Sequence, residues 1–191
     1  MANLLDAPKK ARYYTKINLK NAYHLVRIAK GKEWKTTFCT RYGLFEWLVM
    51  PFGLSNAPLA FQRLMNEIFA NLLDVSVVIY LNDILIYSNS LEDHKGHIKE
   101  ILHQLHTNGL YASLSKCLFH KEKVKFLGFI LGPEGIQMDK EKIRTIKTWP
   151  TPCKFKDVQA FLGFMNFYRR FIYNYSQQSI LLTHLTKKNT S

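Results

Sequence analysis

The sequence predicts an α+β fold, and three observations support this class. Residues 75–88 contain two apolar, β-branched runs on either side of a short polar tip, which favours a buried β-hairpin. Runs of this kind alternate with helix start and stop signals, without internal repeats or low-complexity tracts. With 191 residues, 47% of them hydrophobic, the chain can bury a substantial core in one or two subdomains.

The first part of the chain alternates strand and helix patterns. In chain order we expect the end of a helix at 2–8, strands at 13–19, 25–28, 36–40 and 44–49, and a helix at 60–72. The two strands at 36–40 and 44–49 should pair across the turn Arg41-Tyr42-Gly43. Asn56 and Pro58 mark the helix start, as a cap residue followed closely by proline.

The second part follows the hairpin. Its expected elements are a helix from Ser90 to about Asn108, a strand at 124–131, a long helix at 157–172 and a shorter helix at 179–186. Gly109 is a typical helix stop, and Gly132-Pro133 ends the strand. The segment Trp149-Pro150-Thr151-Pro152 breaks the chain before the long helix.

Composition excludes several classes. No apolar stretch approaches the roughly 18 to 20 residues of a membrane span, and the first residues do not resemble a secretory signal, so we expect an intracellular protein without a membrane partner. Cys39, Cys117 and Cys153 are scattered and form no CxxC pair. This pattern indicates reduced thiols and argues against a zinc site.

The charge is strongly basic and unevenly distributed. The chain carries 27 Lys and Arg against 14 Asp and Glu, a net charge of +13. Residues 112–191 hold 14 basic and 5 acidic side chains and so contribute +9 of this charge. A basic surface favours a polyanionic partner through phosphate contacts and counterion release. A basic domain without a nucleic-acid role remains the alternative.

Several motifs occur along the chain in one order. They are Lys16-Ile17-Asn18-Leu19, Tyr23, Met50 to Pro58 with Phe61-Gln62, Tyr80-Leu81-Asn82-Asp83, Leu114 to Cys117, Phe126 to Phe129, Trp149-Pro150, Phe161 to Phe164 and Phe167 to Phe171. Their order resembles the reverse transcriptase of gypsy-type long-terminal-repeat retrotransposons over nearly the whole chain. The Tyr-x-x-Asp motif alone is weak evidence, whereas the ordered set is specific.

The resemblance implies a right-hand polymerase, with an antiparallel palm sheet covered by helices on one face and a helical thumb. We expect the palm over 1–112, including the later part of the fingers at about 30–50, the primer-grip strands and a connecting helix over 113–148, and the thumb helices over 149–191. The implied activity is RNA-directed DNA polymerisation. The family's N-terminal fingers, which grip the triphosphate, and its later regions fall outside this sequence, so we expect a fragment of a polyprotein enzyme.

In this family, one aspartate from the first palm strand and two from the hairpin hold two Mg²⁺ ions, which activate the primer hydroxyl and stabilise the displacement. The matching residues here are Asn18, Asn82 and Asp83. We therefore expect Asn18 and Asp83 to meet across adjacent strands. Because an amide brings no negative charge, the predicted metal ligand is Asp83, with Asn18 and Asn82 at degenerate positions, and we expect Mg²⁺ binding to be weak or absent.

The loss of these two anions predicts an inactive enzyme. Two alternatives stay open: a non-catalytic nucleic-acid-binding or interaction module that retains the fold, and an active enzyme that uses Asp83 and water as metal ligands. Asn82 also suits an ordinary tight turn, and Asn18 an ordinary strand end.

The resemblance also assigns nucleotide-binding residues. Tyr23 matches the aromatic residue that stacks under the incoming sugar and excludes a 2′-hydroxyl. Phe52 borders the nucleotide pocket, Gly53 permits close backbone approach, and Lys116 lies near the leaving pyrophosphate. A core tyrosine and a solvated lysine are the ordinary alternatives for Tyr23 and Lys116.

Two further segments match nucleic-acid contacts. The primer grip corresponds to Phe126, Leu127, Gly128 and Phe129, for which a plain buried strand is the alternative. The thumb track corresponds to Gln159, Gly163 and Phe167, which lie four residues apart on one helix face, followed by Arg169 and Arg170. Gly163 could instead be a packing contact in a core helix.

The implied partners are an RNA or DNA template–primer duplex, deoxynucleotides only if the enzyme is active, and other parts of the same polyprotein. The implied location is a cytoplasmic particle or the nucleus.

Overall fold

A computed structural model describes residues 2–187, and the chain forms two compact units. Unit 1 comprises Met1–Phe126 and Leu131–Ile136, and unit 2 comprises Leu127–Ile130 and Gln137–Ser191. Helices and antiparallel sheets occur together, which confirms the predicted α+β class. The expected division into palm, primer-grip and thumb segments stays a prediction.

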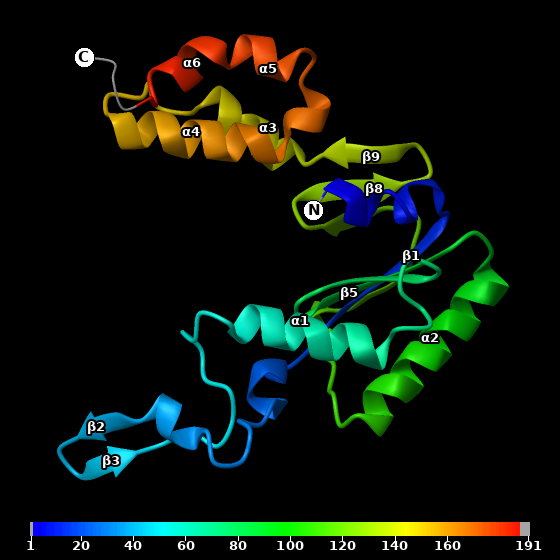
Figure 1. Cartoon of the computed structure of the whole chain (residues 1–191). Coiled ribbons are helices and arrows are strands. Elements are labelled where there is room, and N and C mark those ends of the chain that lie inside the picture. Colours follow the sequence, from blue (N-terminus) through cyan, green and yellow to red (C-terminus); the bar gives the residue numbers. More distant parts are fainter. Residues whose placement is uncertain (1, 188–191) are drawn as a thin grey trace. The chain divides into compact units, whose positions relative to one another are not determined.

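The centre of unit 1 is a four-stranded sheet of order β4-β5-β1-β6 (Figure 1). Its strands are β1 (Tyr13–Asn18), β4 (Val77–Tyr80), β5 (Asp83–Ser88) and β6 (Leu118–Lys121). The pairs β4–β5, β1–β5 and β1–β6 are all antiparallel. The predicted hairpin of residues 75–88 is confirmed as β4 and β5, whereas β6 was not predicted.

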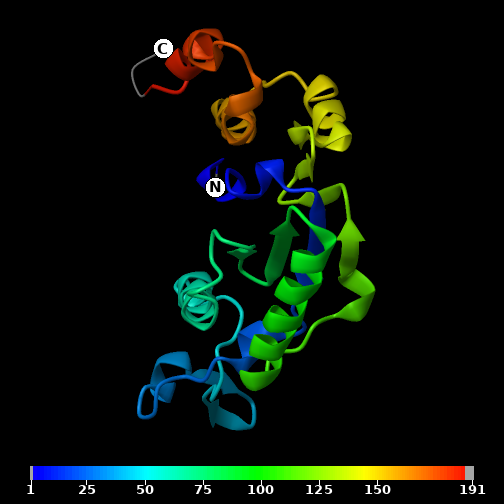
Figure 2. The same cartoon turned by 90° about the vertical axis from the view of Figure 1, so that its right-hand side faces the viewer.

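Strand alternation divides the side chains between two faces of this sheet. Ile17 lies opposite Ile84, which in turn lies opposite Ile79, so these three side chains share one face. Helices α1 (Ala57–Ile68) and α2 (Leu91–Thr107) pack on this face (Figures 1 and 2). The main core of the protein therefore lies between the sheet and these two helices.

Both helices present a regular apolar stripe to the core. The buried residues are Ala57, Phe61 and Met65 in α1, and His94, Ile98, Ile101 and Leu105 in α2. The predicted cap of α2 is confirmed, because Ser90 Oγ accepts a hydrogen bond from the Asp93 amide at 3.1 Å. The start of α1 is also confirmed, although the Asn56 side chain makes no capping hydrogen bond.

The opposite face of the sheet is covered by the N-terminal turns. The expected helix at 2–8 consists instead of two 3-10 turns, η1 (Ala2–Leu5) and η2 (Pro8–Lys10). The fully buried Tyr14 hydroxyl lies 2.8 Å from the carbonyl oxygen of Pro8 and 2.9 Å from that of Ala11. This side chain therefore anchors the turns to β1.

A small hairpin, β2 (Phe38–Thr40) and β3 (Gly43–Phe45), extends from unit 1 beyond α1 (Figure 1). It confirms the predicted pairing, with shorter strands. The strand expected at 25–28 is wrong: η3 (Ala22–Leu25) and a single bridge between Arg27 and Val49 occupy this region. Leu25 is exposed there, and one bridge does not make a strand ladder.

Unit 2 contains the remaining helices. These are α3 (Lys140–Lys147), α4 (Phe155–Phe167), the 3-10 turn η6 (Arg169–Phe171), α5 (Tyr175–Gln178) and α6 (Ile180–His184). The long helix predicted to reach 172 therefore stops at Phe167. The short helix predicted at 179–186 is confirmed as α6 with shorter bounds, and α5 precedes it. Within residues 2–187, no helix is both long and apolar enough to cross a membrane.

A three-stranded sheet has the order β7-β8-β9. The chain passes from one unit to the other within or next to these strands. It consists of β7 (Val124–Phe126), β8 (Phe129–Gly132) and β9 (Gly135–Met138). The single strand predicted at 124–131 is wrong, because the chain turns at Leu127 and Gly128. Their φ angles of 49° and 81° are left-handed, a backbone conformation that glycine tolerates and that ends an extended strand.

A buried histidine connects α2 to the sheet. His94 Nε2 lies 2.9 Å from Thr15 Oγ1, and His94 Nδ1 lies 2.9 Å from Ser88 Oγ. The pKa of His94 is lowered from 6.5 to about 4, mainly by burial and also by the neighbouring His120 and His97, while a hydrogen bond with the Tyr14 backbone acts in the opposite direction. The fold therefore favours the neutral imidazole.

This depressed pKa predicts a stability change in acid. The unfolded chain protonates His94 near pH 6.5, and the folded chain only near pH 4, so stability should be complete above pH 6.5 and should fall as the pH drops to 4. The expected loss is at most about 3 kcal/mol in the free energy of unfolding. Urea titrations at several pH values would measure it. His103 is exposed, so His103→Gln should show the same dependence of the free energy of unfolding on pH. If His94→Gln lost stability just as steeply between pH 6.5 and 4, His94 would not be the group responsible.

The β7–β8 turn makes a second stability prediction. A Cβ at Gly128 would lie 2.8 Å from the hydroxyl oxygen of the buried Tyr168. Gly128→Ala should therefore destabilise the protein by about 1 to 3 kcal/mol through strain at positive φ and overpacking. In a Tyr168→Phe background the overpacking disappears, so the same substitution should be less damaging there. Equal losses in both backgrounds, measured by thermal unfolding, would show that the contact is unimportant.

Candidate active site

The candidate site lies on the sheet face opposite α1 and α2. Asn18, the last residue of β1, pairs directly with Asp83, the first residue of β5. The Asn18 amide donates a hydrogen bond from Nδ2 to Asp83 Oδ1 at 3.0 Å. The predicted approach of these two residues is therefore confirmed. Lys16 shares their face because it precedes Asn18 by two residues on the same strand.

The hairpin tip differs in detail from the prediction. The turn residues are Leu81 and Asn82, while Asp83 already belongs to β5 and pairs with Tyr80. Leu81 has a left-handed φ of 53°, which leaves its amide free to bond away from the hairpin. Gln62 of α1 accepts a hydrogen bond from this amide at 2.8 Å. The helix thereby holds the tip in place.

Backbone hydrogen bonds connect the tip to neighbouring segments. The Leu19 amide donates to the carbonyl oxygen of Asn82 at 2.8 Å. The Ser113 amide donates to the carbonyl oxygen of Asn18 at 2.8 Å. Three segments that lie far apart in the sequence therefore meet at Asn18 and Asn82.

Of the three expected ligand positions, Asn18, Asn82 and Asp83, only Asp83 carries a carboxylate. We call these three residues the centre, and its carboxylate already has partners. Lys16 Nζ lies 3.2 Å from Asp83 Oδ1, the same oxygen that accepts the Asn18 hydrogen bond. An amide that donates to a carboxylate turns its own oxygen away from it. Magnesium prefers several anionic oxygen ligands, so this donor set does not fit the ion. Across residues 2–187, no group of three or more His, Cys, Asp and Glu side chains is arranged to hold a metal.

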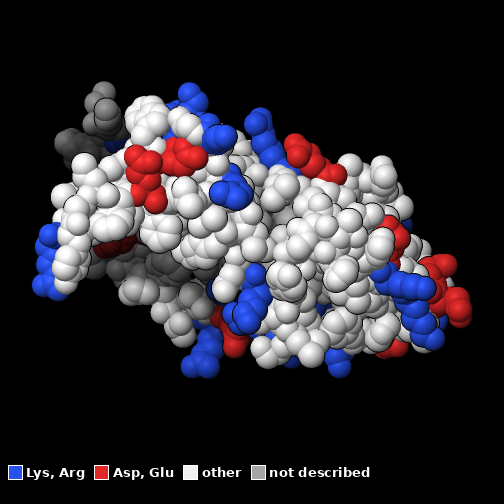
Figure 3. Space-filling view, turned by 90° about the horizontal axis from the view of Figure 1, so that it is seen from below, with Lys and Arg blue, Asp and Glu red and all other residues white. Residues whose placement is uncertain are grey.

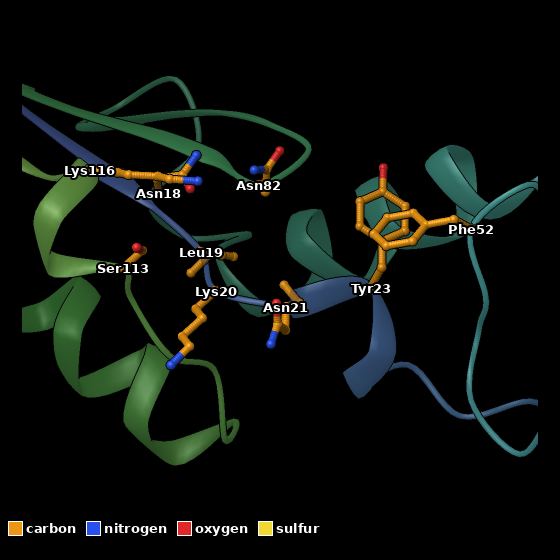
Figure 4. Close-up of a pocket in the computed structure, with 10 residues that line it drawn as sticks. Asn18, Leu19, Lys20, Asn21, Tyr23, Phe52, Asn82, Ser113 and Lys116 are labelled. Atoms are coloured by element: carbon orange, nitrogen blue, oxygen red, sulfur yellow. The ribbon is translucent and has the colours of Figure 1, made fainter.

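A pocket of about 280 Å³ opens beside this centre (Figure 4). The predicted residues that line it are Asn18, Tyr23, Phe52, Asn82 and Lys116. Figure 4 shows Lys116 beside Asn18, with Tyr23 and Phe52 on the far side of Asn82. Lining residues that were not predicted are Leu19, Lys20, Asn21, Ala22 and Ser113. The lining contains two lysines and no carboxylate.

Tyr23 forms one wall of this pocket while packing on the core. Its ring stacks on the buried Phe61 with 4.7 Å between ring centroids, and the Phe52 ring lies 5.5 Å away. Burial raises the pKa of the Tyr23 hydroxyl, and nearby Tyr80 raises it further. Tyr23 is therefore a half-buried, neutral ring whose polar edge can face a ligand. Tyr23 therefore both lines the pocket and packs on the core, and its predicted contact with a nucleotide sugar stays a prediction.

Phe52 and Gly53 are both exposed: the Phe52 side chain is 71% exposed, and a Cβ at Gly53 would meet no atom within 4 Å. Gly53 has a φ of 97°, a conformation in which other residues are strained. Gly53 does not line the pocket, whereas Phe52 does. The glycine therefore shapes the loop that presents the Phe52 ring.

The predicted primer-grip residues have unequal access to solvent. The rings of Phe126 and Phe129 are buried, and only Leu127 and Gly128 at the turn are partly exposed. Phe129 stacks on Phe167, with centroids 5.3 Å apart. Phe126 and Phe129 thus support the turn and are not surface contacts, which agrees with the alternative of a buried strand for these two rings.

The predicted thumb track forms an exposed stripe. Gln159, Gly163 and Phe167 are all exposed along α4. A Cβ at Gly163 would meet no atom within 4 Å, so this glycine is not an internal packing contact. Arg169 and Arg170 follow on η6 and are also exposed. The stripe offers an amide, an open backbone and an aromatic edge, with two guanidinium groups next in the chain.

The excess of basic residues does not form one patch on the face drawn in Figure 3. There, Lys and Arg side chains are scattered among uncharged residues and mixed with Asp and Glu (Figure 3). A net charge of +13 still favours anionic ligands at long range, because the summed field acts beyond individual contacts.

The structure adds Lys16 and Lys20 to the residues predicted from sequence. Lys16 could have been found from strand alternation, since it stands two residues before Asn18. Lys20 follows the end of β1, and its amide donates to the carbonyl oxygen of Tyr111. Lys20 thus lies in the pocket lining directly after Asn18 and Leu19.

Known proteins resemble this chain in sequence and in structure. The family model described as "Reverse transcriptase (RNA-dependent DNA polymerase)" matches residues 2–131. The Retrovirus-related Pol polyprotein from transposon 297 of Drosophila melanogaster is 40% identical over 190 residues, which cover 100% of this chain and 18% of that protein. The Transposon Tf2-3 polyprotein of Schizosaccharomyces pombe is 40% identical over 176 residues, which cover 92% of this chain and 13% of that protein.

Solved structures agree with these relatives. The foamy viral protease-reverse transcriptase in complex with RNA/DNA hybrid matches with a TM-score of 0.85 and 25% identity, covering 98% of this chain and 25% of that chain. The same viral protein in a form with double-stranded DNA matches with a TM-score of 0.86 and 25% identity, covering 96% of this chain and 32% of that chain. The present chain therefore spans less than a fifth of the matched polyproteins' length and at most a third of these solved chains.

The ordered motifs, the sheet that pairs Asn18 with Asp83, and the match over residues 2–131 agree with one another. The chain belongs to the reverse transcriptase family.

Proposed function

We propose that this chain is a reverse transcriptase domain of a retrotransposon polyprotein that binds a template–primer duplex without extending it. The observation that carries this proposal is the state of Asp83. It is the one carboxylate among the three expected ligand positions, and an ammonium and an amide already bond to it.

The chemistry explains why this arrangement opposes catalysis. In the family, bound magnesium activates the primer hydroxyl and balances the charge of the displacement. Here Asn18 and Asn82 supply neutral oxygens, and Asn18 turns its NH₂ group towards Asp83. The residues of this chain can therefore position a primer end, but they do not supply the anionic ligands that polymerisation requires.

Duplex binding has separate support. Two structural neighbours at 25% identity are reverse transcriptases in complex with RNA/DNA hybrid or double-stranded DNA. In this chain, the exposed stripe of Gln159, Gly163 and Phe167 can follow a groove, because an open glycine permits close approach. Arg169 and Arg170 can reach phosphates, which position a duplex without reading its sequence.

We expect no primer extension by the unmodified chain with deoxynucleotides and Mg²⁺. The double variant Asn18→Asp, Asn82→Asp should gain divalent-metal affinity because it restores two anions to the centre. Calorimetric titration with Mn²⁺ would measure this gain, with Asp83→Asn as the negative control. Robust extension by the unmodified chain would refute the proposed loss of catalysis.

The same proposal predicts a steep dependence of duplex binding on salt. Arg169→Ala with Arg170→Ala should weaken binding to all sequences alike and reduce the salt slope by roughly one to two units, at about 0.9 per phosphate contact. Fluorescence anisotropy at several salt concentrations would measure both effects.

Lys95→Ala with Lys99→Ala is a matched control for this experiment. It removes two exposed positive charges from α2, which packs on the sheet face away from the candidate site. This variant should leave the slope nearly unchanged. If the unmodified chain has no affinity for an RNA–DNA or DNA duplex even at low salt, the binding part of the proposal is wrong.

A further inference from the structure

Lys16 forms a short, shielded ion pair with Asp83. Its ammonium lies 3.2 Å from Asp83 Oδ1, and the two side chains are only 23% and 25% exposed. The pairs Lys9–Asp6 and Lys123–Glu134 are longer, at 3.4 Å each, and their side chains are 43% to 65% exposed. Water and salt therefore screen the Lys16–Asp83 pair least.

Asp83 needs such a partner. A partly buried carboxylate is costly unless a counter-charge and hydrogen bonds compensate for its lost hydration. The Asn18 amide supplies one hydrogen bond and no charge. Lys16 is thus the source of positive charge in direct contact with Asp83 within the described part of the chain.

We propose that Lys16 is a built-in counter-cation of this centre, which balances Asp83 in the place where a divalent ion would otherwise act. The proposal builds on the assignment of the site under the proposed function. It assigns Lys16 a positioning role: its ammonium holds the Asp83 carboxylate beside the Asn18 amide without metal.

This role makes Lys16 a competitor of metal. A divalent ion that approaches Asp83 Oδ1 must displace the ammonium or remain close to its positive charge, and both options oppose binding. The weak metal binding expected of this centre therefore has two causes, the missing anions at Asn18 and Asn82 and the cation at Lys16.

The first experiment measures thermal unfolding of Lys16→Gln in EDTA and again with Mn²⁺. In EDTA, this variant should melt about 2 to 4 °C below the unmodified chain, because Asp83 has lost its counter-charge. Adding Mn²⁺ should recover at most a small part of this loss, because Asp83 is then free of the ammonium but is still one carboxylate beside two amides. The unmodified chain should not respond to Mn²⁺ in the same range.

Two control variants separate this role from a general charge effect. Lys9→Gln removes a lysine from the exposed pair with Asp6 and should show no Mn²⁺-dependent change in melting temperature. Lys16→Arg keeps the charge and should behave like the unmodified chain. In an Asp83→Asn background, Lys16→Gln should cost little, since the pair no longer exists.

A second experiment keeps the proposal testable if Lys16→Gln alone folds poorly. In the Asn18→Asp, Asn82→Asp background, adding Lys16→Gln should tighten Mn²⁺ binding by about tenfold or more, measured by electron paramagnetic resonance. Removal of a unit charge a few ångströms from the ion is worth at least the roughly 1.4 kcal/mol that a factor of ten requires.

An unchanged Mn²⁺ affinity in this background, or a melting-temperature loss in Lys16→Gln that is equally large in the Asp83→Asn background, would overturn the proposal. Neither readout involves duplex binding or primer extension. The role of Lys16 and the proposed function can therefore fail independently.

Discussion

The antiparallel register of β1 against β5 is the constraint on which the rest of unit 1 depends. It places Ile17 opposite Ile84 on the helix face and Asn18 opposite Asp83 on the other face. A slip by one residue would bring Asn18 and Lys16 into the apolar core and expose Ile17. Burial of the isoleucines under α1 and α2 therefore also positions the polar centre, without any contribution from the polar residues themselves.

The chemistry of the centre follows from this scaffold and from two amides. The backbone bonds at Asn18 and Asn82 do not depend on whether the side chain is an acid or an amide. The backbone of the centre therefore places these two positions whatever their side chains are, while the amides bring no negative charge. With Lys16 and Asn18 both bonded to Asp83, the remaining acid is neutralised within the protein.

In unit 2, too, the buried packing groups and the exposed polar groups are different residues. The Phe129 ring lies buried against Phe167 and Tyr168, and Gly128 gives room to the Tyr168 hydroxyl. Gln159 and Gly163 face solvent on the same helix. Aromatic packing thus determines where the turn and α4 lie, while small and polar groups are left accessible on the α4 surface.

The sequence by itself determined the α+β class, the 75–88 hairpin, the starts of α1 and α2 and the meeting of Asn18 with Asp83. These features rest on local periodicity, on caps and on an ordered motif set, all of which can be seen in the amino-acid string. Sequence also identified half of the pocket residues, including Tyr23, Phe52 and Lys116.

Tertiary structure decided the remainder. Strand β6 was missed because its residues are mostly exposed and form a strand only by pairing with β1. The strand expected at 124–131 became a hairpin because Leu127 and Gly128 adopt left-handed angles. Lys16 acquires its partner only when β5 brings Asp83 beside it, since an ion pair between residues far apart in sequence depends on the register that packing of the core selects.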